Sequence, residues 1–327
     1  MAEATIRDVA RKAEVSVASV SRALSGAANV SAETKERIAR AVSELGYIPH
    51  AGARSLSHGR THAIGVVLPD LHGEFFSEIV RGMDREASAN DYLLLLSPMH
   101  GGGRQATTAL RAMRGRVDGL LLMAPHIAPE ELRGALPANL PAVLINTRSS
   151  VGRTSIRLDN AAGMRAVVAH LLAQGKRHFV HLRGPAGNLD AQERADAITD
   201  ALDAAGLRPI FMPGNFEESG GHAAIRQLVA DGTRFDAVIA ANDMMAIGAL
   251  TALRQAGVEV PRTVAVTGFD DVPLARHLDL TTVRVRIADL GAEAIVRLLA
   301  ELGGERPSEE QLHQPELVVR RTTEEPS

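Results

Sequence analysis

Residues 5–22 decide the fold of the amino-terminal region, and they read TIRDVARKAEVSVASVSR. Ile6, Val9 and Ala13 recur at the spacing of one helix face, which predicts a short first helix. Ser16 follows a tight turn and is a suitable N-cap for a second helix. Two short helices joined by a tight turn are typical of a helix-turn-helix.

A third helix is predicted to complete this region. Ser31 is a suitable N-cap, and Ile38 and Leu45 fall on one helix face. Gly46 is a typical residue at the end of a helix. The sequence therefore predicts a three-helix head over residues 1–49.

The second helix carries the side chains expected to contact DNA bases. A helix-turn-helix sets this helix in the major groove and uses the start of the helix on base edges. Val17, Ala18, Ser21 and Arg22 share one face of the helix, whereas Val20 points toward the core. The Arg22 guanidinium has the fork that pairs with guanine, worth about 1–3 kcal/mol of discrimination.

The head also offers residues for the phosphate backbone, namely Thr5, Ser16 and Asn29. Residues 1–60 hold nine basic and six acidic residues, a net charge of +3, whereas the remainder holds 27 and 33, a net charge of −6. A basic head on an acidic body is typical of a phosphate-binding module joined to another domain. The alternative is an ordinary three-helix bundle, which shows the same apolar pattern.

Beyond residue 62 the chain alternates between apolar strands and amphipathic helices. Continuous apolar runs are typical of parallel strands that helices cover on both faces. We therefore predict an α/β body of two doubly wound parallel sheets, with a ligand beyond the carboxyl ends of the strands. The predicted buried strands are Ile64–Leu68, Tyr92–Leu96, Gly119–Met123, Ala142–Ile145, Phe179–Leu182, Ala237–Ala240 and Val264–Thr267, and the helices include Ala161–Ala173 and Met244–Gln255.

The composition excludes several classes of protein. The 327 residues contain no cysteine, which excludes disulfides and thiolate metal sites and suits a reducing cytoplasm. No apolar run approaches the roughly 18 residues of a membrane helix, and charged residues replace the apolar core of a signal peptide. No nucleophile elbow, zinc-protease motif or P-loop occurs. We expect a cytoplasmic protein that is not an enzyme and binds no cofactor, metal or membrane.

Further motifs resemble one family along nearly the whole chain. They are VSAET (30–34), LGYIP (45–49), ARSL (53–56), IGV (64–66), ANDMMAIG (241–248), GFDD (268–271) and LTTVR (280–284). Together with residues 5–22, and in this order, they resemble the LacI/GalR family of bacterial repressors. Val17 and Ala18 are similar to the galactose-repressor branch. The resemblance implies a helix-turn-helix head and a body like a periplasmic binding protein.

The resemblance also implies how the chain is divided. Residues 1–49 would bind DNA, residues 50–61 would form a hinge and linker, and residues 62–327 would bind an effector and dimerise. Within the body, residues 62–158 with 288–312 would form one subdomain, and residues 159–287 with 313–327 the other. A homodimer would bind a pseudo-palindromic operator. No leucine heptad follows the last strand, so a dimer is expected rather than a tetramer.

The implied hinge becomes helical only on operator DNA, where Leu56 would insert into the central minor groove. The residues implied to contact DNA in and beside the hinge are Tyr47, His50, Ala53 and Leu56. Two residues depart from the family pattern. Glu14 stands in the turn where the family usually has Gly, at a cost of about 1 kcal/mol if its φ is positive. His50 stands where the family favours Asn.

An effector is implied between the two halves of the body. The matching residues are Asp70, Phe75, Phe76, Asn146, Arg148, Arg194, Phe216, Asn242 and Asp270. Carboxylate, amide and guanidinium groups can satisfy sugar hydroxyls, and unpaired buried groups cost about 1–3 kcal/mol each. Arg194 and Asp270 are the main candidates. Four other polar residues are interpreted as structural: Asp159, Asn160, Asp243 and Asp271. Of these, Asp159 and Asp243 are predicted to be helix N-caps.

Several functional alternatives stay open at this stage. A sugar is the expected effector, but Val285-Arg286 replaces the Gln-Pro of many relatives, so a purine is not excluded. A sugar-binding protein of periplasmic type fits the body and not the head, and an α/β enzyme with a small accessory head is a third class. The expected mechanism is repression, in which the effector shifts the population that binds DNA. Whether the effector induces or corepresses stays open.

Overall fold

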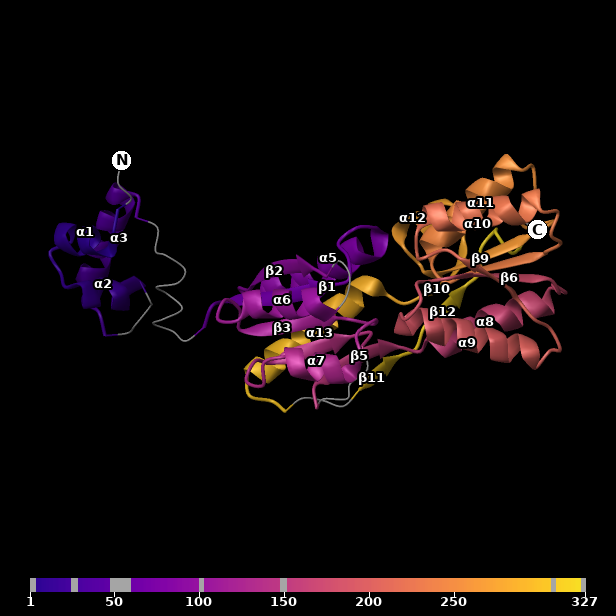
Figure 1. The fold of residues 1–327 in the computed structure, drawn as a ribbon. Helices are drawn as coiled ribbons and strands as arrows, with labels where there is room; N and C mark the ends of the chain where they lie inside the picture. Colours follow the sequence, from indigo (N-terminus) through magenta and orange to yellow (C-terminus); the bar gives the residue numbers. More distant parts are fainter. Residues whose placement is uncertain are drawn as a thin grey trace. The chain divides into compact units, whose positions relative to one another are not determined.

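The computed structural model describes residues 4–24, 29–47, 60–99, 103–147, 152–306 and 310–324. The chain forms two compact units. The first comprises residues 1–63 with 115–118, and the second comprises residues 64–114 with 119–327. The three-helix head, coloured indigo in Figure 1, belongs to the first unit, and the α/β body belongs to the second.

Three helices form the head: α1 (Ile6–Lys12), α2 (Val17–Leu24) and α3 (Ala32–Leu45). A hydroxyl group caps the start of each helix. Thr5 Oγ1 accepts from the Asp8 amide at 3.4 Å, Ser16 Oγ from the Ser19 amide at 3.1 Å, and Ser31 Oγ from the Thr34 amide at 3.3 Å. Gly46, with φ of 59°, ends α3 in the left-handed region. The predicted caps at Ser16 and Ser31 and the predicted end at Gly46 are confirmed.

One apolar cluster fills the head. Val9, Val20 and Ile38 bring one side chain from each helix to its centre, and each is at most 1% exposed. Tyr47 follows α3 and is also buried, with 6% of its surface exposed. The helical periodicity of residues 5–47 therefore reflects a real core.

Glu14 lies in the turn between α1 and α2 and has a φ of 54°. The Glu14 amide donates to the Arg11 carbonyl at 3.3 Å, and Arg37 donates to the Glu14 carbonyl at 3.4 Å. A non-glycine residue in the left-handed region costs about 1–2 kcal/mol. The turn therefore has the geometry that suits a glycine, and Glu14 occupies it under strain.

The body alternates strands and helices along the chain. Their bounds are β1 (Ala63–Leu68), α5 (Glu74–Ala89), β2 (Leu93–Pro98), α6 (Gly103–Met113), β3 (Gly119–Met123), α7 (Pro129–Ala135), β4 (Ala142–Ile145), β5 (Thr154–Leu158), α8 (Asn160–Ala173), β6 (Phe179–Arg183), α9 (Leu189–Asp203), β7 (Ile210–Pro213), α10 (Glu218–Ala230), β8 (Ala237–Ala240), α11 (Asp243–Gln255), β9 (Ala265–Asp270), α12 (Pro273–His277), β10 (Thr281–Arg284), α13 (Ile287–Leu302), β11 (Gln311–His313) and β12 (Glu316–Val318).

The strands form two six-stranded sheets with the same pattern of connections. One sheet has the order β11-β5-β4-β3-β1-β2, and the other has the order β12-β10-β9-β8-β6-β7. In the first sheet β1 pairs parallel with β3, β3 with β4, β4 with β5 and β5 with β11, whereas β12 runs antiparallel to β10 in the second. In each sheet the order reverses direction beside the first strand, which is the doubly wound arrangement. The predicted fold class is confirmed.

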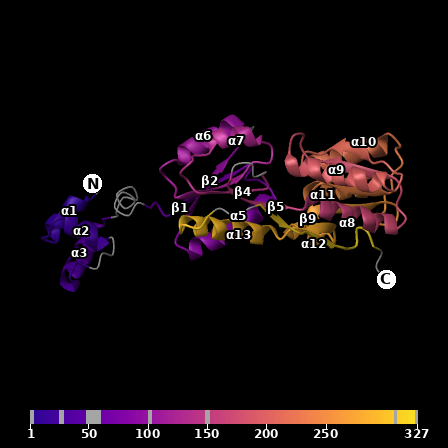
Figure 2. The same cartoon turned by 90° about the horizontal axis from the view of Figure 1, so that it is seen from below.

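Helices cover both faces of each sheet. Figure 2 shows α6 and α7 on one face of the first sheet and α5 with α13 on the other. Figure 1 shows α10 and α11 on one face of the second sheet and α8 with α9 on the other. Two glycines let α5 and α13 approach closely, because a Cβ atom at Gly82 would overlap the Ala288 carbonyl and one at Gly291 would overlap the Ile79 carbonyl.

Strand β2 corrects one prediction. The Tyr92–Leu96 run was expected to be a buried strand, yet Leu93 is 73% exposed and Leu95 and Leu96 are about two-fifths exposed. The reason is that β2 lies at the edge of its sheet, where one side has no neighbouring strand among the described residues. The apolar composition indicated a strand correctly but could not show its place in the sheet.

Replacing Glu14 with glycine should stabilise the head. The glycine removes the Cβ that makes φ of 54° costly, so we expect a gain of about 0.5–1 kcal/mol after its added flexibility is counted. Hydrogen exchange of the head amides in the full-length protein measures this. Glu14→Ala is the matched control, since it keeps the Cβ and should give no gain. Equal protection in Glu14→Gly and wild type would contradict the strain.

Candidate functional site

The predicted base-contacting face of α2 is exposed. Val17 has 42% of its surface accessible, Ala18 and Arg22 are also exposed, and Ser21 is half-buried. Val20, on the opposite face, is completely buried. The capped start of α2 thus presents two apolar groups, a hydroxyl and a guanidinium together. This combination suits contact with base edges in a major groove.

The residues predicted for phosphate contacts have varied surroundings. Thr5 and Ser16 use their hydroxyls as helix caps, and Asn29 is exposed in the turn before α3. Tyr47 is largely buried in the head core, a structural role that the sequence interpretation did not include. His50, Ala53 and Leu56, and Arg148 of the predicted effector site, lie outside the described residues.

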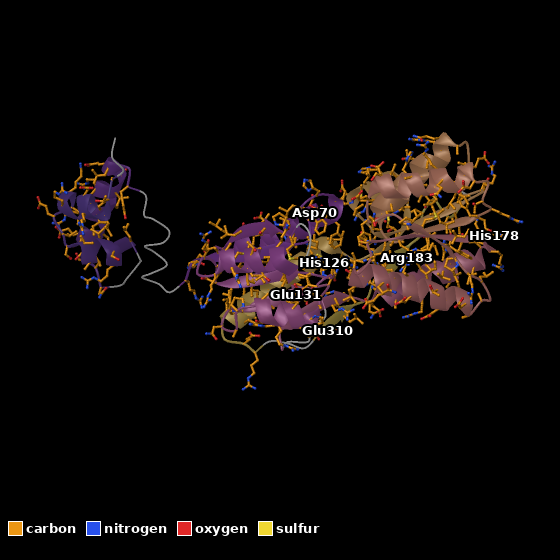
Figure 3. The ribbon with its side chains drawn as sticks, in the orientation of Figure 1. Asp70, His126, Glu131, His178, Arg183 and Glu310 are labelled. Atoms are coloured by element: carbon orange, nitrogen blue, oxygen red, sulfur yellow. The ribbon has the colours of Figure 1, made fainter. Side chains whose placement is uncertain are left out.

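Most of the predicted effector residues follow the carboxyl ends of strands. Asp70 and Asn146 follow β1 and β4 of the first sheet, whereas Phe216 and Asn242 follow β7 and β8 of the second. Asp270 is the last residue of β9. Figure 3 shows Asp70 and Arg183, the last residue of β6, at the ends of their strands. Parallel strands bring such ends to one edge of a sheet, where ligands of doubly wound folds bind.

Two of these residues carry buried atoms that the protein leaves without a hydrogen bond. Asn146 Oδ1 and Asp270 Oδ1 are both buried and have no hydrogen-bond partner among the described residues. Asn146 is 1% exposed and Asp270 is 5% exposed. A buried polar atom left unpaired costs about 1–3 kcal/mol, so such atoms are uncommon unless a ligand or water satisfies them. The Asn146 oxygen lies beside the first sheet and the Asp270 oxygen beside the second.

Arg194 is the centre of a buried polar network. Its Nε donates to Asn160 Oδ1 at 2.8 Å, and its Nη1 donates to the Ala241 carbonyl at 2.5 Å. The guanidinium carbon lies 3.7 Å from the centre of the Phe269 ring. Nη1 lies 3.9 Å from Asp270 Oδ1, which is an ion-pair distance but longer than a hydrogen bond. These contacts fix the guanidinium next to the carboxylate oxygen that accepts no hydrogen bond.

Burial raises the pKa of Asp270 to about 7, although the nearby Arg194 guanidinium acts in the opposite direction. Burial also raises the pKa of Asp190, whose carboxyl accepts from Asn160 at 2.8 Å. Charged carboxylates are costly in a dry interior unless they are paired. A ligand with hydroxyl donors would compensate this cost at Asp270.

Several residues at the same strand ends have strained backbone conformations. Asn146, Phe216 and Asp270 have positive φ values of 46°, 65° and 117°. Asparagine tolerates this region, but a bulky aromatic residue such as Phe216 rarely adopts it. Strained residues of this kind cluster at ligand sites, where the surrounding fold holds them. The half-buried Phe216 ring lies 5.9 Å from the Arg194 guanidinium carbon, so the aromatic and charged groups adjoin.

Asn242, rather than Asp243, caps the start of α11. Asn242 is the N-cap of α11, because its Oδ1 accepts from the Met245 amide at 3.0 Å, and its Nδ2 donates to the Phe216 carbonyl at 3.0 Å. The predicted N-cap role of Asp243 is therefore wrong. Asp243 is fully buried and accepts from the Val272 amide at 2.9 Å and from the Thr282 hydroxyl at 2.5 Å.

The other polar residues interpreted as structural have structural partners. Asp159 caps α8 through the Ala162 amide at 2.8 Å. Asn160 bonds to the side chains of Asp190, Glu193 and Arg194. Asp271 accepts from Arg284 and Arg320, both at 2.6 Å, and although burial raises its pKa, these two bonds lower it overall.

The remaining predicted residues lie on the first sheet's side of the body. Phe75 and Phe76, at the start of α5, are half-buried with rings 5.5 Å apart in an edge-on arrangement. Asp70 accepts from the Leu71 amide at 2.6 Å and from the His72 ring at 2.9 Å. Burial raises the pKa of Asp70, but its bonds with His72 and Leu71 lower the pKa overall. Asp70 is therefore charged at neutral pH.

The sequence interpretation missed two residues beside this group. Arg183, the last residue of β6, has its guanidinium carbon 5.1 Å from the Phe211 ring centre. His181 is completely buried; its Nδ1 contacts the Ile239 carbonyl at 2.8 Å and its Nε2 has no partner in the described structure. Burial lowers the pKa of His181 to about 4. Polar residues inside an otherwise apolar strand were the signal for both.

A cavity of about 370 Å³ lies elsewhere in the body. It is lined mainly by residues of β5, α8 and α9, and none of the nine predicted effector residues lines it. Three of its charged groups pair with one another, because Arg157 contacts both Glu193 and Glu310, the latter at 3.0 Å. We therefore place the candidate ligand site at the strand ends, where the unpaired atoms lie. Among the described residues, no cluster of His, Asp or Glu could hold a metal ion.

Comparison with known proteins agrees with both parts of this arrangement. Residues 5–50 match the family described as bacterial regulatory proteins, lacI family. Residues 168–323 match the family described as periplasmic binding protein-like domain. No helix in the described part of the chain has the length and apolar character to cross a membrane. A helix-turn-helix head on such a body defines a ligand-responsive class of DNA-binding regulator.

Individual relatives cover nearly the whole chain. The ribose operon repressor of Halalkalibacterium halodurans is 32% identical over 98% of this chain and 97% of its own length. The regulator GalR of Escherichia coli is 32% identical over 99% of this chain and 97% of its own. A crystal structure of the lac repressor dimer bound to operator and the anti-inducer ONPF has a TM-score of 0.89 at 29% identity, covering 98% of this chain and 99% of that one. The chain belongs to the lacI family of bacterial regulatory proteins.

The raised pKa of Asp270 should appear in the pH dependence of stability. A carboxyl that holds its proton more tightly when folded contributes stability below its unfolded pKa, near 3.8, and loses it as the pH rises toward about 7. Between these pH values, the free energy of unfolding of wild type should fall relative to Asp270→Asn by up to about 1.4 kcal/mol per pH unit. Urea unfolding at a series of pH values measures this.

Asp271 provides the matched control, since it is the next residue and its pKa is lowered. A lowered pKa contributes stability above the ordinary value of 3.8 and loses it only in more acidic solution. Asp271→Asn should therefore be less stable than wild type by a constant amount between pH 5 and pH 7. Parallel pH profiles for wild type and Asp270→Asn would show that Asp270 titrates normally.

Proposed function

We propose that this protein is a transcriptional repressor that binds operator DNA through α2 and is controlled by a small sugar bound at the strand ends of the body. The observation that carries the effector part is the pair of unpaired buried oxygens on Asn146 and Asp270. The observation that carries the DNA part is the exposed face of the capped helix α2.

In the proposed complex, α2 enters the major groove. Arg22 pairs with guanine, and the exposed methyl groups of Val17 and Ala18 contact thymine methyls. The remaining DNA contacts come from phosphate-binding residues and from the hinge. We assign these to Thr5, Ser16, Asn29, Tyr47, His50, Ala53 and Leu56, whereas Ser21 belongs to the base-contacting face of α2. The division into residues 1–49, 50–61 and 62–327, with two subdomains in the last, is proposed on the same basis.

For the effector we favour a sugar over a purine. Asp270 and Asn146 offer acceptors to hydroxyl donors, and Phe216 offers an aromatic surface to the apolar side of a ring. Ribose operon repressors of two bacteria are among the relatives, and a cellobiose complex of the regulator CelR has a TM-score of 0.71 at 29% identity. The network of Arg194 would then transmit occupancy of the site within the half of the body that holds the second sheet.

We propose a homodimer as the functional unit. The exposed leucines of edge strand β2 form an apolar surface that a monomer would leave in water. The lac repressor of similar structure is a dimer on its operator. Two chains on one pseudo-palindrome would match the symmetry of the DNA. As a regulator of bacterial genes, the protein would act in the cytoplasm, and the repressor names of its relatives support a role without catalysis.

Replacing Arg22 with alanine should reduce sequence specificity. An operator duplex is first selected from random sequences with the full-length protein, and its affinity is then divided by that of random duplex. Loss of the guanine pair should lower this ratio about tenfold or more. Arg22→Lys is the control for charge: it should retain the affinity for random duplex and still lose specificity.

The same selected duplex is used to measure how many chains assemble on the DNA. Sedimentation of the complex should give two chains per selected duplex, because each half-site takes one head. A ratio unchanged by Arg22→Ala would contradict the assignment of α2 to the major groove. A mass corresponding to four chains would contradict the dimer.

A thermal-shift screen of the full-length protein tests the effector site. Pentoses, beginning with D-ribose, should stabilise the protein, by about 2.7 kcal/mol at 100 times the dissociation constant. Asn146→Ala should remove this shift because it removes an oxygen that the sugar would satisfy. Asn90→Ala changes an exposed asparagine at the end of α5 and should keep it. Stabilisation by purines alone, or a shift retained in Asn146→Ala, would overturn the proposal.

A further inference from the structure

The carboxylate of Asp118 holds the two residues that precede the first strand of the body. Asp118 Oδ1 accepts from the Thr61 amide at 2.6 Å and from the Thr61 hydroxyl at 2.8 Å. Asp118 Oδ2 accepts from the His62 amide at 2.9 Å. The Asp118 amide in turn donates to the Ala63 carbonyl at 2.8 Å. Four hydrogen bonds therefore tie residues 61–63 to the residue just before β3.

These bonds also fix the direction of the chain. His62 has a φ of 51°, in the left-handed region that non-glycine residues rarely adopt. The bond from the His62 amide to Asp118 holds the backbone in this conformation. The path of the chain as it enters β1 is thus set by one side chain 56 residues away in the sequence.

The second sheet contains the same arrangement at the equivalent place. Asp236 precedes β8 and accepts from the amides of Arg177 and His178 at 3.1 and 2.9 Å. The Asp236 amide donates to the His178 carbonyl at 2.9 Å. Figure 3 shows His178 at the opposite end of β6 from Arg183. There the carboxylate closes the turn between α8 and β6, so the arrangement serves the fold alone.

In the first sheet the same arrangement stands where the proposed hinge joins the body. We propose that Asp118 is a positioning residue for operator binding: its carboxylate fixes the point and direction from which the hinge leaves β1. This inference rests on the proposed regulatory function. Two heads can bind one operator together only if their linkers hold them near the required spacing. An unanchored residue must be ordered when the DNA binds, and that entropy weakens the complex.

The test uses the full-length protein and two duplexes, the selected operator and a single half-site. Asp118→Ala should lower operator affinity about tenfold while leaving half-site affinity unchanged, because one head alone does not depend on the spacing. Asp118→Asn keeps an acceptor for both Thr61 bonds but its amide cannot accept from His62, so an intermediate loss is expected. Thr61→Val, which removes one bond and keeps the shape, should also reduce operator affinity.

Asp236→Ala is the matched control. It removes the same kind of carboxylate from the same place in the other sheet, so it should lower the melting temperature as much as Asp118→Ala and leave operator affinity unchanged. Equal operator affinity for wild type, Asp118→Asn and Thr61→Val would overturn the inference, even if Asp118→Ala failed to fold. Parallel losses on operator and half-site would also overturn it. Failure of wild type to select any duplex would instead overturn the proposed function.

Discussion

Burial of parallel strands on both faces is the constraint on which the body depends. Strands such as β1, β3 and β8 are completely covered, so their backbone groups must pair within the sheet and their side chains must be apolar. Many polar groups with other tasks then lie at the strand ends, although His181 is buried within β6. The carboxyl ends carry the unpaired oxygens of Asn146 and Asp270. The opposite ends carry the carboxylates of Asp118 and Asp236, which fasten one strand entrance to the next.

The carboxyl ends of the strands carry groups that destabilise the folded state, and the rest of the body must offset this cost. Positive φ at Phe216 and Asp270, a raised pKa at Asp270 and unpaired oxygens all oppose folding. The Arg194 network holds these groups in place through bonds to Asn160 and Ala241 and contact with Phe269. Groups held ready for a ligand need little rearrangement when it binds, which favours affinity.

Local chemistry explains which parts of the fold the sequence predicted. The caps at Ser16 and Ser31 and the end of α3 at Gly46 depend on residues next to them in the chain, and all were predicted. Strands β5 and β10 were missed because they carry polar residues such as Thr154 and Thr281. Strand β7 was missed because prolines at 209 and 213 leave only three apolar residues between them. No internal repeat is visible in the sequence, yet the two sheets share one order, since many apolar sequences satisfy the same strand positions.

The sequence predicted which residues lie in the candidate site, but not which groups those residues bond to. Polar residues after buried strands indicated the region of Asn146, Asn242 and Asp270, but which of Asn242 and Asp243 caps α11 depends on Thr282 and Val272, which are distant in sequence. The sequence likewise showed an unusual residue at Glu14, while the structure was needed to establish its φ.

The leucine-rich edge strand β2 affects how a newly synthesised chain folds and assembles. An open strand edge with Leu93 at 73% exposure can extend the sheet of any neighbouring molecule, correct or not. While this edge stays uncovered, it favours misassembly over solubility, and the proposed homodimer would cover it. Pairing would then bring a gain in folding free energy that grows with protein concentration. Scarcity of the protein would itself limit how much of it persists in folded form.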